Sequence, residues 1–241
     1  MSSLPLHIES VMRKNGLILD APRKDMLCRY VELLLEWNKR INLISRHDTE
    51  TIWSSHILHS LSPLFLLDIP VGAAALDLGT GGGLPGIPMA IVHSGLAITL
   101  LDSVQKKTRA LQSIVQELNL TSARVVAGRA EDVAVLGEHS RAYDMVVSRA
   151  VGPLKDLVGW SRPFLRKRGL DPTRRLHLVG GKKNEFHFPY LLALKGGDLE
   201  GERRGVLGRV PEDAITELAI VFPGSAIPEL VDKKLVIVEM P

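Results

Sequence analysis

Cysteine and long apolar runs are what this chain of 241 residues has least of. Its single cysteine, Cys28, excludes an internal disulfide and any metal site built from several cysteines, so we expect a reducing compartment and no bound metal. No apolar run approaches the ~20 residues that cross a bilayer, and residues 1–5 contain no apolar signal region. These absences favour a cytoplasmic protein that does not enter a membrane.

Net charge is also low, at +3, but the basic residues are unevenly placed. Residues 162–183 carry eight Lys or Arg and one acid, Asp171, so this segment is net +7 and the rest of the chain is net −4. A concentrated basic segment favours a polyanionic partner such as nucleic acid. On charge alone, a solvated loop explains the segment equally well.

Residues 4–70 have helical patterning, which predicts an N-terminal helical extension. Asp20 is a candidate N-cap, with Pro22 in the first turn that follows. A second helical stretch covers residues 51–67, where Pro63 predicts a bend or a break. This extension either packs on the ligand side of the domain that follows or is a plain structural addition.

From residue 73 onward, apolar strands and amphipathic helices alternate. The predicted strands cover residues 73–76, 97–102, 123–127, 143–147, 190–197, 219–222 and 234–238, and the predicted helices cover residues 87–92, 106–119 and 154–165. Such alternation is typical of a doubly wound α/β fold with a parallel sheet. We therefore predict a Rossmann-like domain over residues 71–241, with seven strands of which the last two form a reversed hairpin.

A glycine-rich turn joins the first predicted strand to its helix. It has the spacing D-x-G-x-G-x-G, with Asp77 followed by Gly79, Gly81 and Gly83. Glycines at this place let backbone N–H groups approach a ligand. A nicotinamide fingerprint has the spacing G-x-G-x-x-G and needs no acid there. A carboxylate at the strand end suits a cationic ligand, and this favours S-adenosyl-L-methionine over a turn that binds nothing.

Other polar residues follow the ends of the later strands. Asp102 comes 23 residues after Gly79, near the ~20-residue spacing at which an acid binds a nucleotide ribose. Glu131 lies in a loop predicted to flank an adenine ring, and Arg149 ends the fourth strand. Each has a structural alternative, a helix cap for Asp102 and an ion pair for Arg149. Because ligands bind at the carboxyl ends of such strands, the set predicts one site.

The sequence also narrows the nucleophile that would accept a methyl group. Methylation of pyrimidine carbon-5 needs an attacking thiolate, and Cys28 lies in a predicted helix away from the strand ends. Methylation of an exocyclic amine commonly uses an Asn/Asp-Pro-Pro-aromatic turn, where this chain has residues 148–150, Ser-Arg-Ala. A guanine nitrogen-7 already carries a lone pair, so catalysis there needs positioning more than a base.

Several motifs together resemble the bacterial 16S ribosomal RNA guanine-N7 methyltransferases, a family earlier named glucose-inhibited division protein B. They are residues 37–43, 56–60, 77–88, 100–103, 148–150 and 192–196. The resemblance implies methyl transfer from S-adenosyl-L-methionine to a guanine in the decoding-centre loop of the small ribosomal subunit. The implied partner is 16S rRNA or the 30S subunit, with a monomer as the default state.

The resemblance also assigns residues. By position, it places Gly79, Leu84, Ala130 with Glu131, and Arg149 at the cofactor, in addition to Asp77, Gly81 and Asp102 from the argument above. On the substrate side, with catalytic roles, it suggests three residues: Asn38, Arg149 and Lys195.

Two features depart from the family pattern. A basic insert at about residues 166–189 replaces a short glycine turn, and His59 stands where an acid is usual. If the insert grips RNA, deleting residues 168–184 weakens RNA binding more at low salt than at high salt, because phosphate contacts release counterions. Equal RNA affinity after the deletion would refute that role.

Three alternative functions remain open at this stage. One is a methyltransferase of a small molecule or protein, and another is a non-catalytic rRNA-binding assembly factor. The third is a nicotinamide enzyme, which the glycine spacing disfavours.

Overall fold

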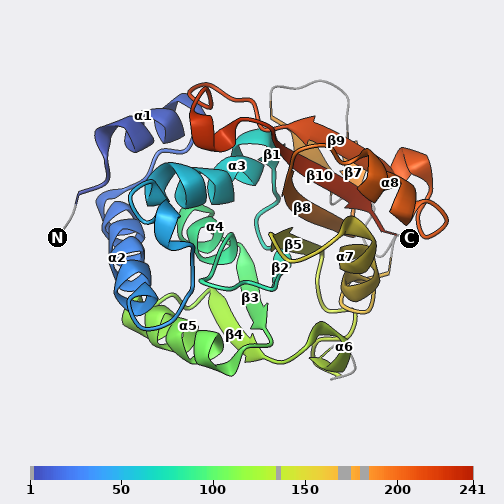
Figure 1. The fold of residues 1–241 in the computed structure, drawn as a ribbon, viewed down its shortest axis with the longest axis horizontal. Coiled ribbons are helices and arrows are strands. Elements are labelled where there is room, and N and C mark those ends of the chain that lie inside the picture. Colours follow the sequence, from blue (N-terminus) through green and yellow to red (C-terminus); the bar gives the residue numbers. More distant parts are fainter. Residues whose placement is uncertain (1–2, 134–136, 168–174, 180–184, 241) are drawn as a thin grey trace.

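The computed structural model describes residues 3–133, 137–167, 175–179 and 185–240. Its centre is a seven-stranded sheet in the order β4-β3-β2-β5-β8-β10-β9 (Figure 1). The strands are β2 (Ala74–Leu78), β3 (Ala97–Asp102), β4 (Ala123–Ala127), β5 (Met145–Arg149), β8 (Tyr190–Gly196), β9 (Ile215–Ala219) and β10 (Lys233–Glu239). The pairs within the first five are parallel, whereas β10 runs antiparallel to both neighbours. The predicted fold class is therefore confirmed, including the reversed terminal hairpin.

Alternate residues of the central strands point to two different hydrophobic cores. Ala75 and Met145 belong to one core, while their neighbours Leu76 and Val146 belong to the other. This alternation follows from the two-residue period of a strand. Because both faces of the strand are buried, β2 is apolar at nearly every position.

Helices cover both faces of the sheet (Figure 1). Five contribute to the first core: α1 (Leu6–Lys14), α2 (Ala21–Asn38), α3 (His59–Leu66), α4 (Gly86–Val92) and α5 (Gln105–Glu117). Three contribute to the second: α6 (Ala130–Val133), α7 (Leu154–Ser161) and α8 (Glu200–Val206). The N-terminal helices thus share a core with β2, β3 and β5. No helix in the described ranges has the length and apolarity needed to cross a membrane.

The N-terminal helices begin as predicted but differ in detail. Asp20 caps α2, since its carboxylate accepts a hydrogen bond from the backbone N–H of Arg23 at 3.0 Å. Residues 51–67 contain a π-helix (Trp53–Leu58) that runs directly into α3, and Pro63 lies inside α3 without ending it. Proline cannot donate to the carbonyl of His59, and the Ser62 hydroxyl donates to that carbonyl instead, at 2.8 Å.

Two strand boundaries differ from the sequence prediction. The strand expected at residues 219–222 lies at Ile215–Ala219, because Ile220 and Phe222 are apolar through burial in the first core and not through sheet pairing. The strand expected at residues 143–147 begins at Met145. Asp144, just before it, uses its side chain to accept hydrogen bonds from the Ala74 N–H and from Arg166.

Part of the basic insert forms a small second sheet. The short strands β1 (Leu67–Asp68), β6 (Arg175–Leu178) and β7 (Glu185–His187) pair antiparallel in the order β1-β6-β7. The insert therefore pairs with the end of the N-terminal helical segment. Residues 168–174 and 180–184, on which the RNA-gripping hypothesis depends, lie outside the described residues.

Candidate active site

The glycine-rich turn after β2 has a backbone that other residues adopt with difficulty. Gly79, Gly81 and Gly83 have φ angles of +70°, +57° and +92°. The N–H groups of Gly79 and Thr80 both donate to the carbonyl of Leu101, at 2.9 and 3.0 Å, which ties the turn to the end of β3. A Cβ on Gly79 would lie 2.5 Å from a methyl group of Val151. This turn therefore keeps its shape only with glycine at position 79.

Asp77 lies beneath the turn and not in a pocket, which differs from the expectation that its carboxylate faces a ligand. Its side chain is fully buried, and Oδ2 accepts hydrogen bonds from the Thr80 hydroxyl at 2.6 Å and the Gly86 N–H at 2.8 Å. Burial raises the pKa of Asp77 to about 7, an effect larger than the opposing effect of these hydrogen bonds. Asp77 thus fastens the turn to the first residue of α4.

Asp102 connects the turn to the next strand. Its Oδ2 accepts a hydrogen bond from the Gly81 N–H at 2.9 Å, and its Oδ1 accepts one from the Val104 N–H at 2.8 Å. The carboxylate is buried but lines a pocket, unlike that of Asp77. Gly81 is fixed by this contact and does not itself line the pocket.

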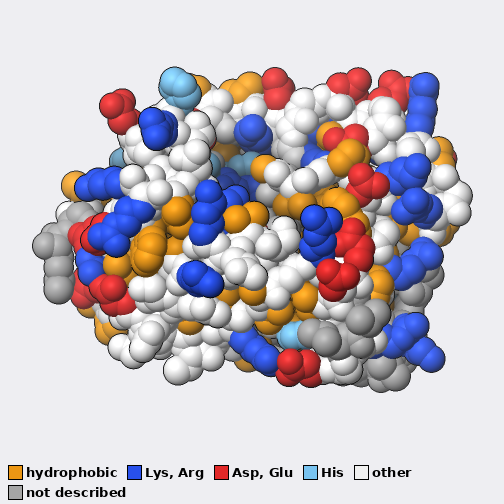
Figure 2. Space-filling view, turned by 60° about the horizontal axis from the view of Figure 1, so that its bottom comes forward, with side chains coloured by type: hydrophobic (Ala, Val, Ile, Leu, Met, Phe, Trp, Pro, Cys, Tyr) orange, Lys and Arg blue, Asp and Glu red, His pale blue; other side chains and the backbone are white. Residues whose placement is uncertain are grey.

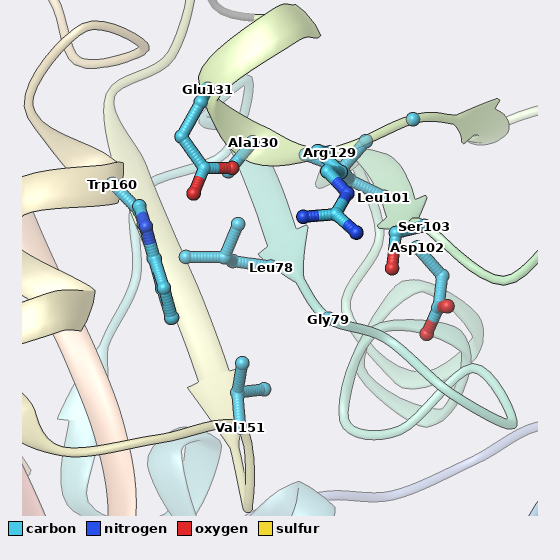
Figure 3. Close-up of a pocket in the computed structure, with 11 residues that line it drawn as sticks. Leu78, Gly79, Leu101, Asp102, Ser103, Arg129, Ala130, Glu131, Val151 and Trp160 are labelled. Carbon is cyan, nitrogen blue, oxygen red and sulfur yellow. The ribbon is translucent and has the colours of Figure 1, made fainter.

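A pocket of about 320 Å³ opens at the carboxyl ends of β2, β3 and β4, and we call it the strand-end pocket (Figure 3). Four of the predicted cofactor residues line it: Gly79, Asp102, Ala130 and Glu131. The other four, Asp77, Gly81, Leu84 and Arg149, do not. Of these, Leu84 is buried and its N–H donates to the carbonyl of Thr80, so it closes the glycine turn.

The sequence analysis missed several residues of this pocket. Figure 3 shows Trp160, from α7, on the wall opposite Arg129 and Asp102, with Glu131 between them and Val151 near Gly79. Arg129 directly precedes the predicted Ala130–Glu131 pair, so its position after β4 was a usable signal. Trp160 reaches the pocket only because α7 packs beside it, which no local pattern in the sequence reveals.

Arg149 and Lys195 lie together in a second cavity of about 550 Å³, at the carboxyl ends of β5 and β8. We call it the Arg149 cavity. Its polar and charged lining includes Asp48, His56, His59, Arg149, Lys195 and Lys233. Figure 2 shows histidine together with Lys or Arg side chains inside a hollow of one face. Two of the three predicted substrate-side residues are therefore brought together.

The guanidinium of Arg149 is held by neutral groups. It donates to the backbone carbonyl of Ser55 at 3.2 Å and to Nδ1 of His56 at 2.7 Å. Burial lowers the pKa of Arg149 below its ordinary value. Burial and the nearby guanidinium lower the pKa of His56 to about 4 and that of His59 to about 3, so both histidines are neutral at physiological pH.

Lys195 is ion-paired in the same cavity. Its ammonium lies 2.7 Å from Oε2 of Glu202 and also donates to the carbonyl of Gly152. Glu202 accepts a further hydrogen bond from the N–H of Leu154, the first residue of α7. Lys195 therefore links the end of β8 to two helices.

Asn38, the third predicted substrate-side residue, lines neither of these pockets. It is buried, and its Oδ1 accepts hydrogen bonds from the N–H groups of Leu43 and Ile44, at 2.8 and 3.0 Å. These contacts fold the chain back after α2, which assigns Asn38 to the loop and not to the reaction site.

Comparison with known proteins gives the relationship of the chain. Residues 23–173 match the family described as GidB, rRNA small subunit methyltransferase G. The chain belongs to this family. The resemblance stated from the motifs is thereby confirmed.

Individual relatives of the GidB family cover most of the chain. Ribosomal RNA small subunit methyltransferase G of Chlorobium luteolum is 38% identical over 81% of this chain and 71% of its own length. The protein of the same name from Salinibacter ruber is 39% identical over 76% of this chain and 77% of its own. These relatives therefore align with both the glycine turn and Arg149.

Solved structures support the fold alone. A methyltransferase from Geobacter sulfurreducens aligns with a TM-score of 0.50 and 12% identity, covering 100% of this chain and 99% of its own. A predicted O-methyltransferase, Atu636 from Agrobacterium tumefaciens, aligns with a TM-score of 0.52 and 14% identity over 76% of this chain and 79% of its own.

Proposed function

We propose that this member of the GidB family transfers a methyl group from S-adenosyl-L-methionine to nitrogen-7 of a guanine in 16S rRNA. The observation that carries the proposal is the strand-end pocket: residues that the family assigns to the cofactor, Gly79, Ala130 and Glu131, meet there beside Asp102. The geometry of the pocket was not used to select these residues, so their meeting is independent support.

The residues of the strand-end pocket fit the nucleoside part of this cofactor. Asp102 and Glu131 offer carboxylate oxygens to ribose hydroxyls, and Trp160 with Leu101 offers apolar surface to a flat base. Its volume of about 320 Å³ falls at the low end of the roughly 300–1,000 Å³ found for small-molecule sites. When bound, the cofactor supplies a sulfonium methyl group as the electrophile.

The protein side of the reaction consists of positioning. Guanine nitrogen-7 brings its own lone pair, so no side chain has to remove a proton from it before attack. Around Arg149 the described groups are suited to this task, because the guanidinium only donates and His56 is neutral. A carbon-5 mechanism lacks its nucleophile here: Cys28 lies in α2 against α5, away from both the strand-end pocket and the Arg149 cavity, and burial raises its pKa.

The wider assignment follows from the reaction. The substrate is 16S rRNA, either free or within the 30S subunit, and the enzyme works in the cytoplasm as a monomer. The N-terminal helices (residues 1–70) support the glycine turn of the methyltransferase domain (residues 71–241), because the hydroxyl of Tyr30 donates to the carbonyl of Gly82.

Methyl transfer from labelled S-adenosyl-L-methionine tests the proposal. The acceptors are 30S subunits, protein-free 16S rRNA and a pool of small metabolites, followed by nuclease digestion and chromatography. We expect label in 16S rRNA as 7-methylguanosine. Label confined to metabolites or protein, or binding of rRNA without transfer, contradicts it.

A matched pair of glycine variants shows whether the strand-end pocket is responsible. Gly79→Ala forces a Cβ against Val151 at a positive φ, and it should abolish transfer. Gly201→Ala, in α8 with nothing within 4 Å of the added Cβ, should leave transfer unchanged.

A further inference from the structure

Arg149 is a buried cation without a carboxylate partner. Its printed contacts are a backbone carbonyl and Nδ1 of His56, and no ion pair joins it to an acid within the described part of the chain. Buried charges in proteins are normally paired. The guanidinium also borders a cavity of about 550 Å³, so an anionic ligand has room to complete the pairing.

The position of Arg149 is set by a chain of hydrogen-bonding groups. Because a guanidinium only donates, Nδ1 of His56 must accept, which assigns the imidazole proton to Nε2. Oδ2 of Asp48 lies 3.3 Å from that Nε2. Asp48 therefore favours the tautomer that holds Arg149, and one of the two acids lining the cavity is already engaged.

Lys233 supplies a second unpaired cation to the same cavity. It is the first residue of β10 and lies opposite Gly196, the last residue of β8. A Cβ on Gly196 would lie 3.4 Å from Nζ of Lys233, so the glycine leaves room for the lysine to extend across the strand end. Among residues that the structure describes, no carboxylate forms an ion pair with Lys233.

The other charges of the cavity are less available. Lys195 is neutralised by Glu202 at 2.7 Å. Glu229, in the 3-10 helix Pro228–Leu230, is the second acid of the lining. The unpaired positive charge is therefore concentrated at Arg149 and Lys233.

We propose that the Arg149 cavity binds a phosphate group of the RNA substrate, held by Arg149 and Lys233. This proposal rests on the proposed function and adds the chemical group that the cavity recognises. A guanidinium binds two phosphate oxygens at once, and a lysine ammonium adds a point charge. Lys and Arg side chains also surround the hollow of Figure 2, which suits the approach of a polyanion.

Two adjacent lysines of β10 provide a matched test. Lys233→Met removes the charge at the cavity and keeps the length of the side chain. Lys234→Met is the control, because successive strand residues face opposite sides and Lys234 pairs with Glu217 at 2.6 Å. With 30S subunits as substrate, we expect Lys233→Met to raise KM about tenfold, leave kcat unchanged, and lower the salt slope of RNA binding by about one. Lys234→Met should change none of these.

A binding experiment tests the phosphate without catalysis. Guanosine 5′-monophosphate and guanosine are titrated by calorimetry into protein saturated with S-adenosylhomocysteine. We expect the monophosphate to bind about tenfold more tightly, since its phosphate gains charge-assisted hydrogen bonds. Lys233→Met should remove this preference, and Lys234→Met should keep it.

Three outcomes overturn the proposal in different ways. Equal affinity for the monophosphate and guanosine shows that the cavity does not recognise phosphate. Weaker binding of S-adenosyl-L-methionine itself in Lys233→Met assigns the anion to the carboxylate of the cofactor. If the preference for the monophosphate holds but the wild-type enzyme methylates no rRNA, the phosphate site stands and the proposed function fails.

Discussion

At the scale of single residues, the environment of each carboxylate decides its role. Asp77 and Asp102 both end strands of the sheet and both bind N–H groups around the glycine turn. Asp77 is wholly enclosed, so its pKa rises to about 7, whereas Asp102 reaches the strand-end pocket. The same residue type therefore serves the turn from beneath in one case and meets the pocket in the other.

The raised pKa of Asp77 predicts a pH dependence of stability. The folded state keeps the Asp77 proton up to a pH of about 7, against a model value of 3.8 for an exposed carboxyl. Its contribution is therefore complete below about pH 4 and is lost as the pH rises through 7. Asp77→Asn is neutral throughout, so its free energy of unfolding should fall less between pH 5 and 8, by on the order of 1–3 kcal/mol.

Urea denaturation at a series of pH values measures this difference. Asp68→Asn is the control, because Asp68 is exposed. Wild type and Asp77→Asn with parallel pH curves would show that Asp77 is ionised in the folded protein at all these pH values.

Trp160 predicts an optical signal for cofactor binding. It lines the strand-end pocket, whereas the other two tryptophans of the chain, Trp37 and Trp53, pack against the first core. Addition of S-adenosyl-L-methionine should change the intrinsic fluorescence, and Trp160→Phe should remove most of that change. An undiminished change in Trp160→Phe places the cofactor away from this wall.

At the scale of elements, the glycine turn is stabilised by α2 from the first core. Tyr30 in α2 is fully buried and its hydroxyl donates to the carbonyl of Gly82 at 2.9 Å. Leu34, one turn later, is also close, since a Cβ on Gly82 would lie 2.9 Å from its Cδ1. The N-terminal extension therefore helps to set the shape of the turn.

Tyr30→Phe tests this connection. The change leaves the carbonyl of Gly82 without its buried donor, which should lower the free energy of unfolding by about 1–3 kcal/mol and weaken cofactor binding. Tyr143→Phe is the control, since it removes a buried hydrogen bond to His139 at a distance from the turn. We expect Tyr143→Phe to lose stability and retain cofactor affinity. Thermal unfolding and calorimetry measure the two effects, and an unchanged cofactor affinity in Tyr30→Phe contradicts the link.

Local patterns predicted the elements better than they predicted the contacts between them. Strand-helix alternation gave the sheet, and the D-x-G-x-G-x-G spacing gave the turn, because both depend on neighbours in sequence. The enclosure of Asp77 and the arrival of Trp160 depend on how α4 and α7 pack, so the sequence did not reveal them. Asn38 was misassigned for a similar reason: its two hydrogen bonds are short-range, but the motif that contains it suggested a substrate contact.

At the scale of the whole molecule, the first core crosses the proposed boundary at residue 70. Leu27, Leu34 and Ile57 on the N-terminal side pack in the same core as Ala75 and Met145 of the sheet. Helices α1 to α3 and the sheet therefore exclude water from each other. The second core, by contrast, is built from residues beyond position 73.

Truncation distinguishes a shared core from an accessory extension. A chain of residues 71–241 would expose the apolar face that α2 and α3 cover, so we expect it to aggregate or to lack cooperative unfolding. A chain of residues 17–241 loses only α1, with Ile8 and Met12 as its buried residues, and should fold with reduced stability. Size-exclusion chromatography and near-ultraviolet circular dichroism compare the two chains. A monomeric 71–241 chain that unfolds cooperatively and binds S-adenosyl-L-methionine would make the first 70 residues a separable extension, because the turn would then keep its shape without Tyr30.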